Sequence, residues 1–283
     1  PVPWNRELWQ TAFCVAKYEM SYADSYWDTP NSSSWWTDWN TVAYSWSKIP
    51  VSMAWKFPIT ELTQLQAMSA CESIGEWYHL ITNSEWMTVS RNVELEPKNW
   101  SWSIVGQNFM YNWVTNSLTM WCNIDHTVDA PVTWRRWVTT TWNTNCTDQR
   151  NKLTLSNWEE IWDLSWNIWE YVNWANTLDW SDYNTMETQV CWRTDDLWSR
   201  NSFSWNDWYW ECDFSNWYTY TNIWPITPNL NSNNWIWRIY DNWWSVGDMV
   251  FVRGWDASND SASGVYRLYL KWPSNQITMN VGF

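Results

Sequence analysis

The balance of tryptophan and glycine constrains most what this chain can fold into. Its 283 residues include 36 Trp and only 6 Gly, whereas average usage would give about 20 Gly at this length. Fifteen of the Trp directly follow Asn, Asp or Ser, as in Asn173-Trp174, and these are places where glycine-containing turns are expected. A non-glycine residue in a left-handed turn costs about 1–2 kcal/mol. Fifteen such turns would cost roughly 15–30 kcal/mol, which exceeds the total stability of about 5–15 kcal/mol.

We therefore interpret many of these Trp as positions that are glycine in the living cell, where an opal codon is read as Gly. TGG codons at Trp113, Trp166 and Trp243 would exclude this interpretation. The alternative is a protein that is truly rich in Trp.

Charge and hydropathy exclude several classes of protein. The chain has 16 Lys and Arg against 30 Asp and Glu, a net charge of −14, which disfavours binding to nucleic acid or to an anionic membrane surface. No apolar run approaches the roughly 18 residues that span a bilayer. There is neither a linker nor an internal repeat, so we expect one domain over residues 1–283, truncated at both ends.

The six cysteines contain no C-x-x-C pair, which argues against zinc ribbons, thioredoxin-like motifs and c-type haem. An even count in a chain rich in Asn, Ser and Thr favours an exported protein with disulfides. Cys122 with Cys146 and Cys191 with Cys212 are the nearest neighbours in sequence, but six cysteines allow 15 pairings. The alternative is buried free thiols.

Local patterns predict an α+β fold. Residues 13–16 resemble an edge strand. A first helix is expected to begin at the N-cap Thr60 and to stop at Gly75. A second is expected to begin with a capping box formed by Thr82 and Glu85 and to end at Pro97.

Residues after Asn99 favour short strands and long irregular loops, and the clearest strands cover residues 248–253 and 265–271. In the latter, alternation places Arg267, Tyr269 and Lys271 on one outward face.

Most catalytic signatures are absent. The two histidines, His79 and His126, lie far apart, and no G-x-S-x-G elbow or phosphate-binding loop exists even when Trp is read as Gly.

The segment from Asp163 to Glu170 carries the most information. With Trp166 read as Gly, it reads D-L-S-G-N-I-W-E and closely resembles the D-L-S-G-N-V-W-E-W signature of the formylglycine-generating (sulfatase-modifying factor) family. Residues 78–86, 252–255 and 280–283 resemble further family motifs in the same order. The resemblance spans residues 11–283. Trp86, Trp162 and Trp169 fall where that family has large apolar residues, whereas Trp166 and Trp255 fall where it has Gly.

The resemblance implies a C-type-lectin-like α+β fold with two short helices, short strands and long irregular loops. It also implies a structural calcium ion, held by the side chains of Asp163 and Glu170 and by the main-chain carbonyls of Trp166 and Ile168. Such an all-oxygen ligand set suits calcium. Family members commonly have Asn where this chain has Asp163. The alternative is that the two acids only cap and solvate a turn.

The family's catalytic form binds copper through a pair of cysteines shortly after its R-G-G segment. Here no cysteine occurs beyond Cys212, so we expect no copper and no catalytic residues. A thiolate is the nucleophile and soft metal ligand that this chemistry needs. An oxidase acting on a cysteine of a protein substrate remains the alternative function, followed by a structural surface protein.

The C-terminal part also resembles the variable proteins of diversity-generating retroelements, whose diversified residues contact a ligand. The resemblance implies a non-catalytic, extracellular or cell-surface binding protein with a protein or glycan ligand. The positions that would vary and bind are Asp256, Ser258, Asn259, Asp260, Arg267, Tyr269 and Lys271.

Overall fold

The structure is a computed structural model, and it describes only part of the chain. The described residues are 1–3, 11–24, 42–54, 56, 58–100, 102–107, 110, 152–164, 168–178, 191–192, 211–212, 239–241, 247–254, 264–266, 268–273, 277 and 281–283.

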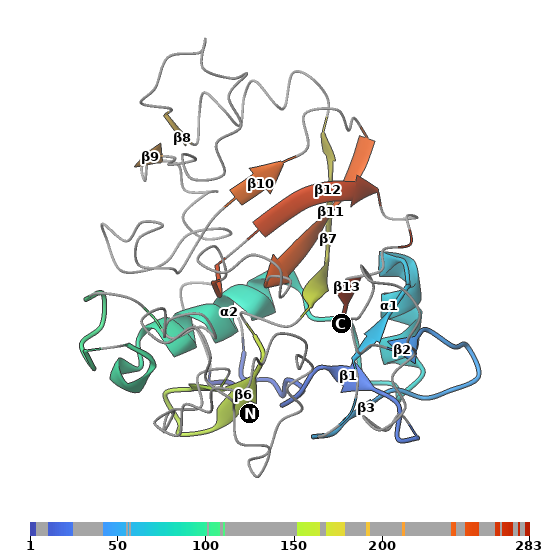
Figure 1. The fold of residues 1–283 in the computed structure, drawn as a ribbon, viewed down its shortest axis with the longest axis horizontal. Coiled ribbons are helices and arrows are strands. Elements are labelled where there is room, and N and C mark those ends of the chain that lie inside the picture. Colours follow the sequence, from blue (N-terminus) through green and yellow to red (C-terminus); the bar gives the residue numbers. More distant parts are fainter. Residues whose placement is uncertain are drawn as a thin grey trace, which may run out of the picture.

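A five-stranded mixed sheet dominates the described part (Figure 1). Its strand order is β10-β12-β11-β7-β13, with β7 and β11 as long central strands. The antiparallel pairing of β11 with β7 aligns Arg253 with Glu170 and Gly254 with Trp169. The short parallel strand β13 places Gly282 opposite Glu170 on the other edge of β7. The bounds of these strands are β7 Trp169–Leu178, β10 Ile239–Asp241, β11 Gly247–Gly254, β12 Leu268–Pro273 and β13 Val281–Gly282.

The remaining strands form four two-stranded sheets, β1 with β3, β2 with β4, β5 with β6 and β8 with β9. Their bounds are β1 Met20–Ser21, β2 Val42–Ala43, β3 Val51–Ser52, β4 Ile59–Thr60, β5 Lys152–Thr154, β6 Glu160–Trp162, β8 Cys191–Trp192 and β9 Glu211–Cys212. Together with two helices, this arrangement is α+β in general, as the sequence predicts.

The second helix is the one that the sequence predicts best. Helix α2 covers Asn83–Glu94, and Thr82 and Glu85 form the expected capping box. Val89 and Val93 are buried as expected. The helix stops before Pro97, which begins the 3₁₀ helix η1, Pro97–Asn99.

The predicted start of the first helix is wrong by three residues. Helix α1 covers Gln64–Glu72, and its capping box is formed by Thr63 and Gln66. Thr60 instead pairs with Ala43 between β4 and β2, and Glu61 turns the chain with a φ of 58°. The predicted stop at Gly75 is also late, because the helix ends at Glu72 and Ser73 is its C-cap.

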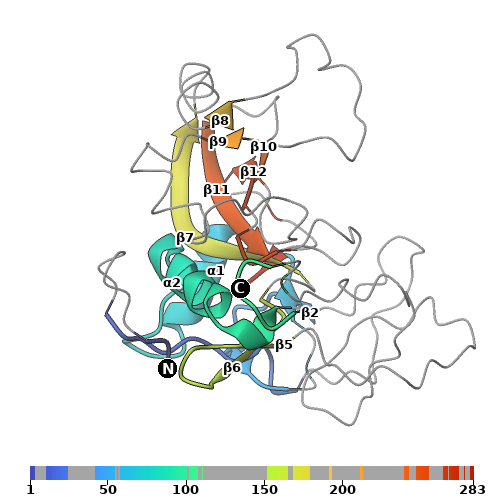
Figure 2. The same cartoon turned by 90° about the vertical axis from the view of Figure 1, so that its left-hand side faces the viewer.

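Both helices are fastened to β7 at their N-terminal ends. The Gln64 side chain donates to the carbonyl of Val172, and the amide of Asn173 donates to the carbonyl of Ile81, just before α2. Figure 2 shows both helices beside the curved lower end of β7. The main core fills the space between α1 and the sheet, and its buried members include Ala67, Ala70, Cys71, Trp169, Tyr171, Val250, Val252, Ile59, Leu62 and Phe283.

Two further expectations need correction. The predicted edge strand over residues 13–16 is absent, and Phe13 makes only an isolated bridge to Val2. Asn173-Trp174, an expected glycine-type turn, lies inside β7. Both errors arise because strand pairing depends on distant partners that a local pattern does not contain. The two C-terminal strands are found, although β12 begins at Leu268 rather than at residue 265.

Candidate functional site

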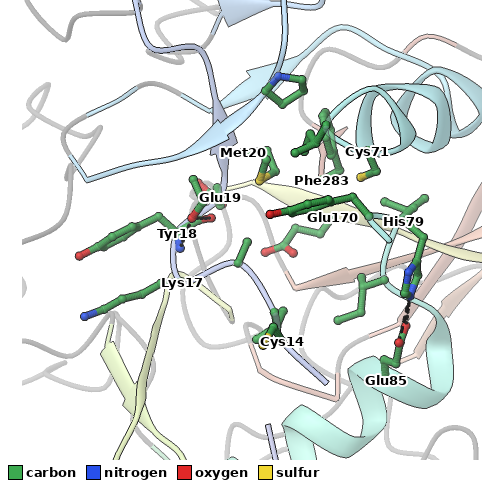
Figure 3. Close-up of a pocket in the computed structure, with 18 of the residues that line it drawn as sticks. Cys14, Lys17, Tyr18, Glu19, Met20, Cys71, His79, Glu85, Glu170 and Phe283 are labelled. Carbon is green, nitrogen blue, oxygen red and sulfur yellow. Dashed lines mark hydrogen bonds and ion pairs between the residues drawn. The ribbon is translucent and has the colours of Figure 1, made fainter. Parts of the chain in front are cut away.

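A cavity of about 900 Å³ lies between the N-terminal segment and the loop that precedes α2. Residues 13–20 form one wall and residues 77–81 the other, and Figure 3 shows Glu170 of β7 between them. A cavity of this size with a few polar groups among apolar walls is typical of a ligand site.

One wall is organised by the cap of α2. Glu85 is buried and accepts hydrogen bonds from the backbone amide and the hydroxyl of Thr82, both at 2.8 Å. The same carboxylate contacts Nε2 of His79 at 3.0 Å, and the His79 side chain is about half exposed. The pair thus fixes the rim of the cavity to the start of the helix. His79, a lone histidine in sequence, has this structural partner, and within the described part of the chain it belongs to no cluster of three or more His, Cys, Asp or Glu side chains.

A second feature is a pair of neighbouring carboxylates. Asp163 follows β6, is buried and has a φ of 60°, while Glu170 is the second residue of β7. Desolvation and, to a smaller extent, the charge of Asp163 together raise the pKa of Glu170 from 4.5 to about 8. No basic side chain of the described part lowers this pKa. Two neighbouring acids, one buried and one half-buried at the wall of the cavity, favour a bound cation.

The neighbouring strand β11 brings a basic residue into register with Glu170. Arg253 is opposite Glu170, but its guanidinium is directed to the side-chain oxygen of Asn83 and to the carbonyl of Tyr266. Its buried charge is therefore used to tie β11 to α2.

Two main-chain carbonyls lie close to Gly254, the residue after Arg253. Gly254 has a φ of +72°, and a Cβ placed on it would lie 3.4 Å from the carbonyl oxygen of Leu164 and 3.5 Å from that of Ile168. The Ile168 carbonyl, a predicted ligand, is therefore directed toward Gly254. Trp166, the other predicted carbonyl ligand, lies outside the described residues.

The donor set fits the calcium ion that the sequence resemblance implies. Among described residues no cluster of three or more His, Cys, Asp or Glu side chains is found. Carboxylate and carbonyl oxygens suit calcium rather than copper or zinc.

Sequence reasoning missed one acidic residue of this region. Glu19 lines the cavity, and its Oε1 accepts a hydrogen bond of 3.4 Å from the backbone amide of Ile168. It is the one acid within the stretch Lys17-Tyr18-Glu19-Met20. The sequence signal that could have identified Glu19 as a candidate site residue is an acid placed between an aromatic and an apolar residue.

Two thiols also line the cavity, Cys14 and Cys71, and both are free. Cys14 is exposed, whereas burial raises the pKa of the Cys71 thiol to about 12. Cys71 is therefore protonated at neutral pH and is a poor nucleophile.

Most of the predicted ligand-binding surface lies outside the described residues. This holds for Asp256, Ser258, Asn259, Asp260 and Arg267. Tyr269 and Lys271 lie in β12, where Tyr269 is in register with Val252 of β11 and Tyr240 of β10.

Comparisons with protein-family models, with curated proteins and with solved structures find no match. Within the described part of the chain, no helix has the length and apolar character needed to cross a bilayer.

Proposed function

We propose that this chain is a calcium-stabilised, non-catalytic ligand-binding domain of the formylglycine-generating type. In this proposal it is exported, binds a protein or a glycan, and uses a diversified C-terminal surface. The observation that carries the calcium part is the neighbouring pair of acids Asp163 and Glu170, of which Glu170 lines the cavity.

Calcium would place a positive charge between the two neighbouring carboxylates. Asp163 and Glu170 would hold it by side-chain oxygens, and the carbonyls of Ile168 and Trp166 would complete the protein's share of ligands. The role is structural, because Asp163 follows β6 and Glu170 lies at the start of β7, so the ion would link these two strands.

The oxidase alternative receives less support from the thiols of the cavity. Copper chemistry of that type requires two close, ionisable cysteines. The Cys71 thiol, with its pKa near 12, does not provide a thiolate at neutral pH. Turnover of a cysteine-containing peptide by the purified protein would overturn our preference for a binding function.

The calcium proposal is tested by thermal unfolding in excess EGTA and after addition of CaCl₂. Saturation at 100 times the dissociation constant stabilises a folded protein by about 2.7 kcal/mol, so calcium should raise Tm clearly. Glu170→Gln should abolish the rise. Glu159→Gln is the matched control, because Glu159 is exposed in the turn between β5 and β6 and should leave the rise intact. An unchanged Tm in both buffers would refute the calcium site.

The binding-surface proposal is tested at the gene. Sequencing the locus through its 3′ flank should reveal opal codons at Trp166 and Trp255, and a near-repeat of the gene's end that differs mainly at adenines, beside a reverse transcriptase. TGG codons and no repeat would remove both the recoding and the diversified surface. Once a ligand is identified, alanine at Tyr269 and Lys271 should weaken binding.

A further inference from the structure

The short strands β8 and β9 bring two cysteines together from positions 21 residues apart. They pair antiparallel, and the register places the Cα atoms of Cys191 and Cys212 opposite each other. Residues 193–210 connect the two strands. We propose that Cys191 and Cys212 form an intramolecular disulfide that closes this segment. The inference is independent of the proposed function.

The backbone spacing of such partners fits a disulfide. Opposite residues of an antiparallel pair have Cα atoms about 4.5 Å or 5.5 Å apart, depending on whether they exchange hydrogen bonds. Disulfides join Cα atoms that lie about 4.4–6.8 Å apart. Both kinds of antiparallel position therefore fall in the permitted range, so the bond needs no change of register.

The backbone hydrogen bonds between β8 and β9 are too few to hold this small sheet together without a further restraint. Each strand has two residues, and among described strands neither pairs with any other. An isolated two-stranded ladder is marginally stable even when it is much longer. A covalent link at the register position would hold the two strands together by restricting the open conformations of the loop.

The bond forms by thiol–disulfide exchange with a disulfide donor such as oxidised glutathione. Cys191 and Cys212 together lose two protons and two electrons, and the donor's disulfide is reduced to two thiols. An oxidising compartment supplies such donors, which agrees with the expected export of the chain.

Cys14 and Cys71 provide internal controls, because both are free and they differ in exposure. The full chain, purified without reductant, is first alkylated in its native state, then alkylated with a second reagent after denaturation, and finally reduced and alkylated with a third. Peptide mass spectrometry assigns each label. We expect the first label on Cys14, the second on Cys71 and the third on Cys191 and Cys212.

A non-reduced digest should contain one linked peptide pair that holds Cys191 and Cys212 and disappears on reduction. In Cys191→Ser, Cys212 has no disulfide partner and should take the first or the second label, before any reduction. Cys14→Ser should leave the linked pair unchanged. Recovery of Cys191 or Cys212 with the first or second label in the unsubstituted chain, or linkage of either to another cysteine, would overturn the proposal. That readout does not depend on whether the variants fold.

Discussion

At the scale of single residues, Trp158 is a described Trp that adopts a backbone conformation typical of Gly. It follows Asn157, has a φ of 71° and is 68% exposed. Its amide donates to the carbonyl of Leu155, which closes the turn between β5 and β6. A residue with positive φ at the end of such a turn is usually Gly. Trp158 therefore supports the interpretation that some Trp positions are glycine in the cell.

The other described Trp that follow Asn or Ser do not share this conformation. Trp46, Trp100, Trp102 and Trp174 have no positive φ, and Trp100 is fully buried. The strain sum from the sequence is therefore too high, because a preceding Asn or Ser does not by itself require a left-handed residue. Each Trp has to be judged from its own backbone.

We predict that Trp158→Gly stabilises the protein. Relief of the left-handed conformation should contribute about 1–2 kcal/mol. Loss of the contact between Nζ of Lys98 and the Trp158 ring, 3.7 Å from its centroid, should cost about 0.5–1 kcal/mol. A net gain of about 1 kcal/mol should appear in urea unfolding. Trp46→Gly, at another exposed site, should give no gain, and Trp162→Gly should destabilise because that ring is buried.

The pKa of Glu170 predicts how the calcium-free protein responds to pH. Burial and Asp163 raise this pKa from 4.5 to about 8, so between these values the folded state holds a proton that the unfolded chain has released. The resulting stability is present below pH 4.5 and is lost as the pH rises through about 8. Tm in EGTA should therefore fall over this range, and Glu170→Gln should flatten the fall. A profile that is equally steep in Glu170→Gln would show that other groups are responsible.

At the scale of elements, β13 is fitted so closely that its glycine has no room for a side chain. A Cβ on Gly282 would lie 2.2 Å from Cδ1 of Ile168 and 2.6 Å from the carbonyl oxygen of Ile59. The second atom is backbone, so a rotamer change does not relieve the contact. Since Gly282 also pairs with Glu170, any shift of β13 is transmitted to the calcium candidate.

Gly282→Ala should therefore destabilise the protein by at least about 1–3 kcal/mol, as overpacking does. Gly75→Ala is the matched control, because a Cβ on Gly75 would lie 3.5 Å from its nearest neighbour, the ring of Tyr78, which is an ordinary contact distance. Urea denaturation of both variants compares them. Equal stability of the two would mean that β13 can move away at little cost.

The two helix caps show which helix starts a local sequence pattern can predict. Thr82 and Glu85 form the expected capping box at the start of α2. This cap is predictable because both of its partners lie within four residues of each other. The sequence pattern places the start of α1 three residues too early, because Thr60 and Thr63 are both acceptable N-caps locally. Strand pairing of Thr60 with Ala43 decides between them, and that partner lies 17 residues away in the chain.

At the scale of the whole molecule, a buried polar network joins α2 to the C-terminal part. The hydroxyl of Tyr266 donates to Glu94 at 2.6 Å, and Arg253 donates to Asn83 at the other end of the helix. Burial and the charge of Glu94 keep the pKa of Tyr266 well above its usual value, so the phenol remains a donor. These contacts connect residues about 170 positions apart.

We predict that Tyr266→Phe destabilises the protein by about 1.5–3 kcal/mol, the range for a hydrogen bond to a charged group. Chemical denaturation measures the loss. Tyr78→Phe should be neutral, because that side chain is exposed. A loss below about 0.5 kcal/mol for Tyr266→Phe, the lower end for ordinary hydrogen bonds, would contradict a stabilising network.

The outward face assigned to Arg267, Tyr269 and Lys271 stays a prediction. Alternation states which residues of a strand share a face, but not whether that face is covered. Tyr269 is in register with Val252, and both Val252 and its neighbour Arg253 are fully buried. Packing around the sheet, rather than the two-residue period, therefore decides which positions of β12 meet solvent.

Local sequence patterns are enough to predict the α+β character, the second helix with its cap and the C-terminal strands, and the family resemblance adds the acids Asp163 and Glu170 as a candidate pair. These depend on residues that lie within a few positions of one another. Only the tertiary structure decided the start of α1, the cavity with Glu19 and His79, and the convergence of the Leu164 and Ile168 carbonyls on Gly254. Those features depend on contacts between distant segments, and a local pattern does not specify which distant backbone will supply the partner.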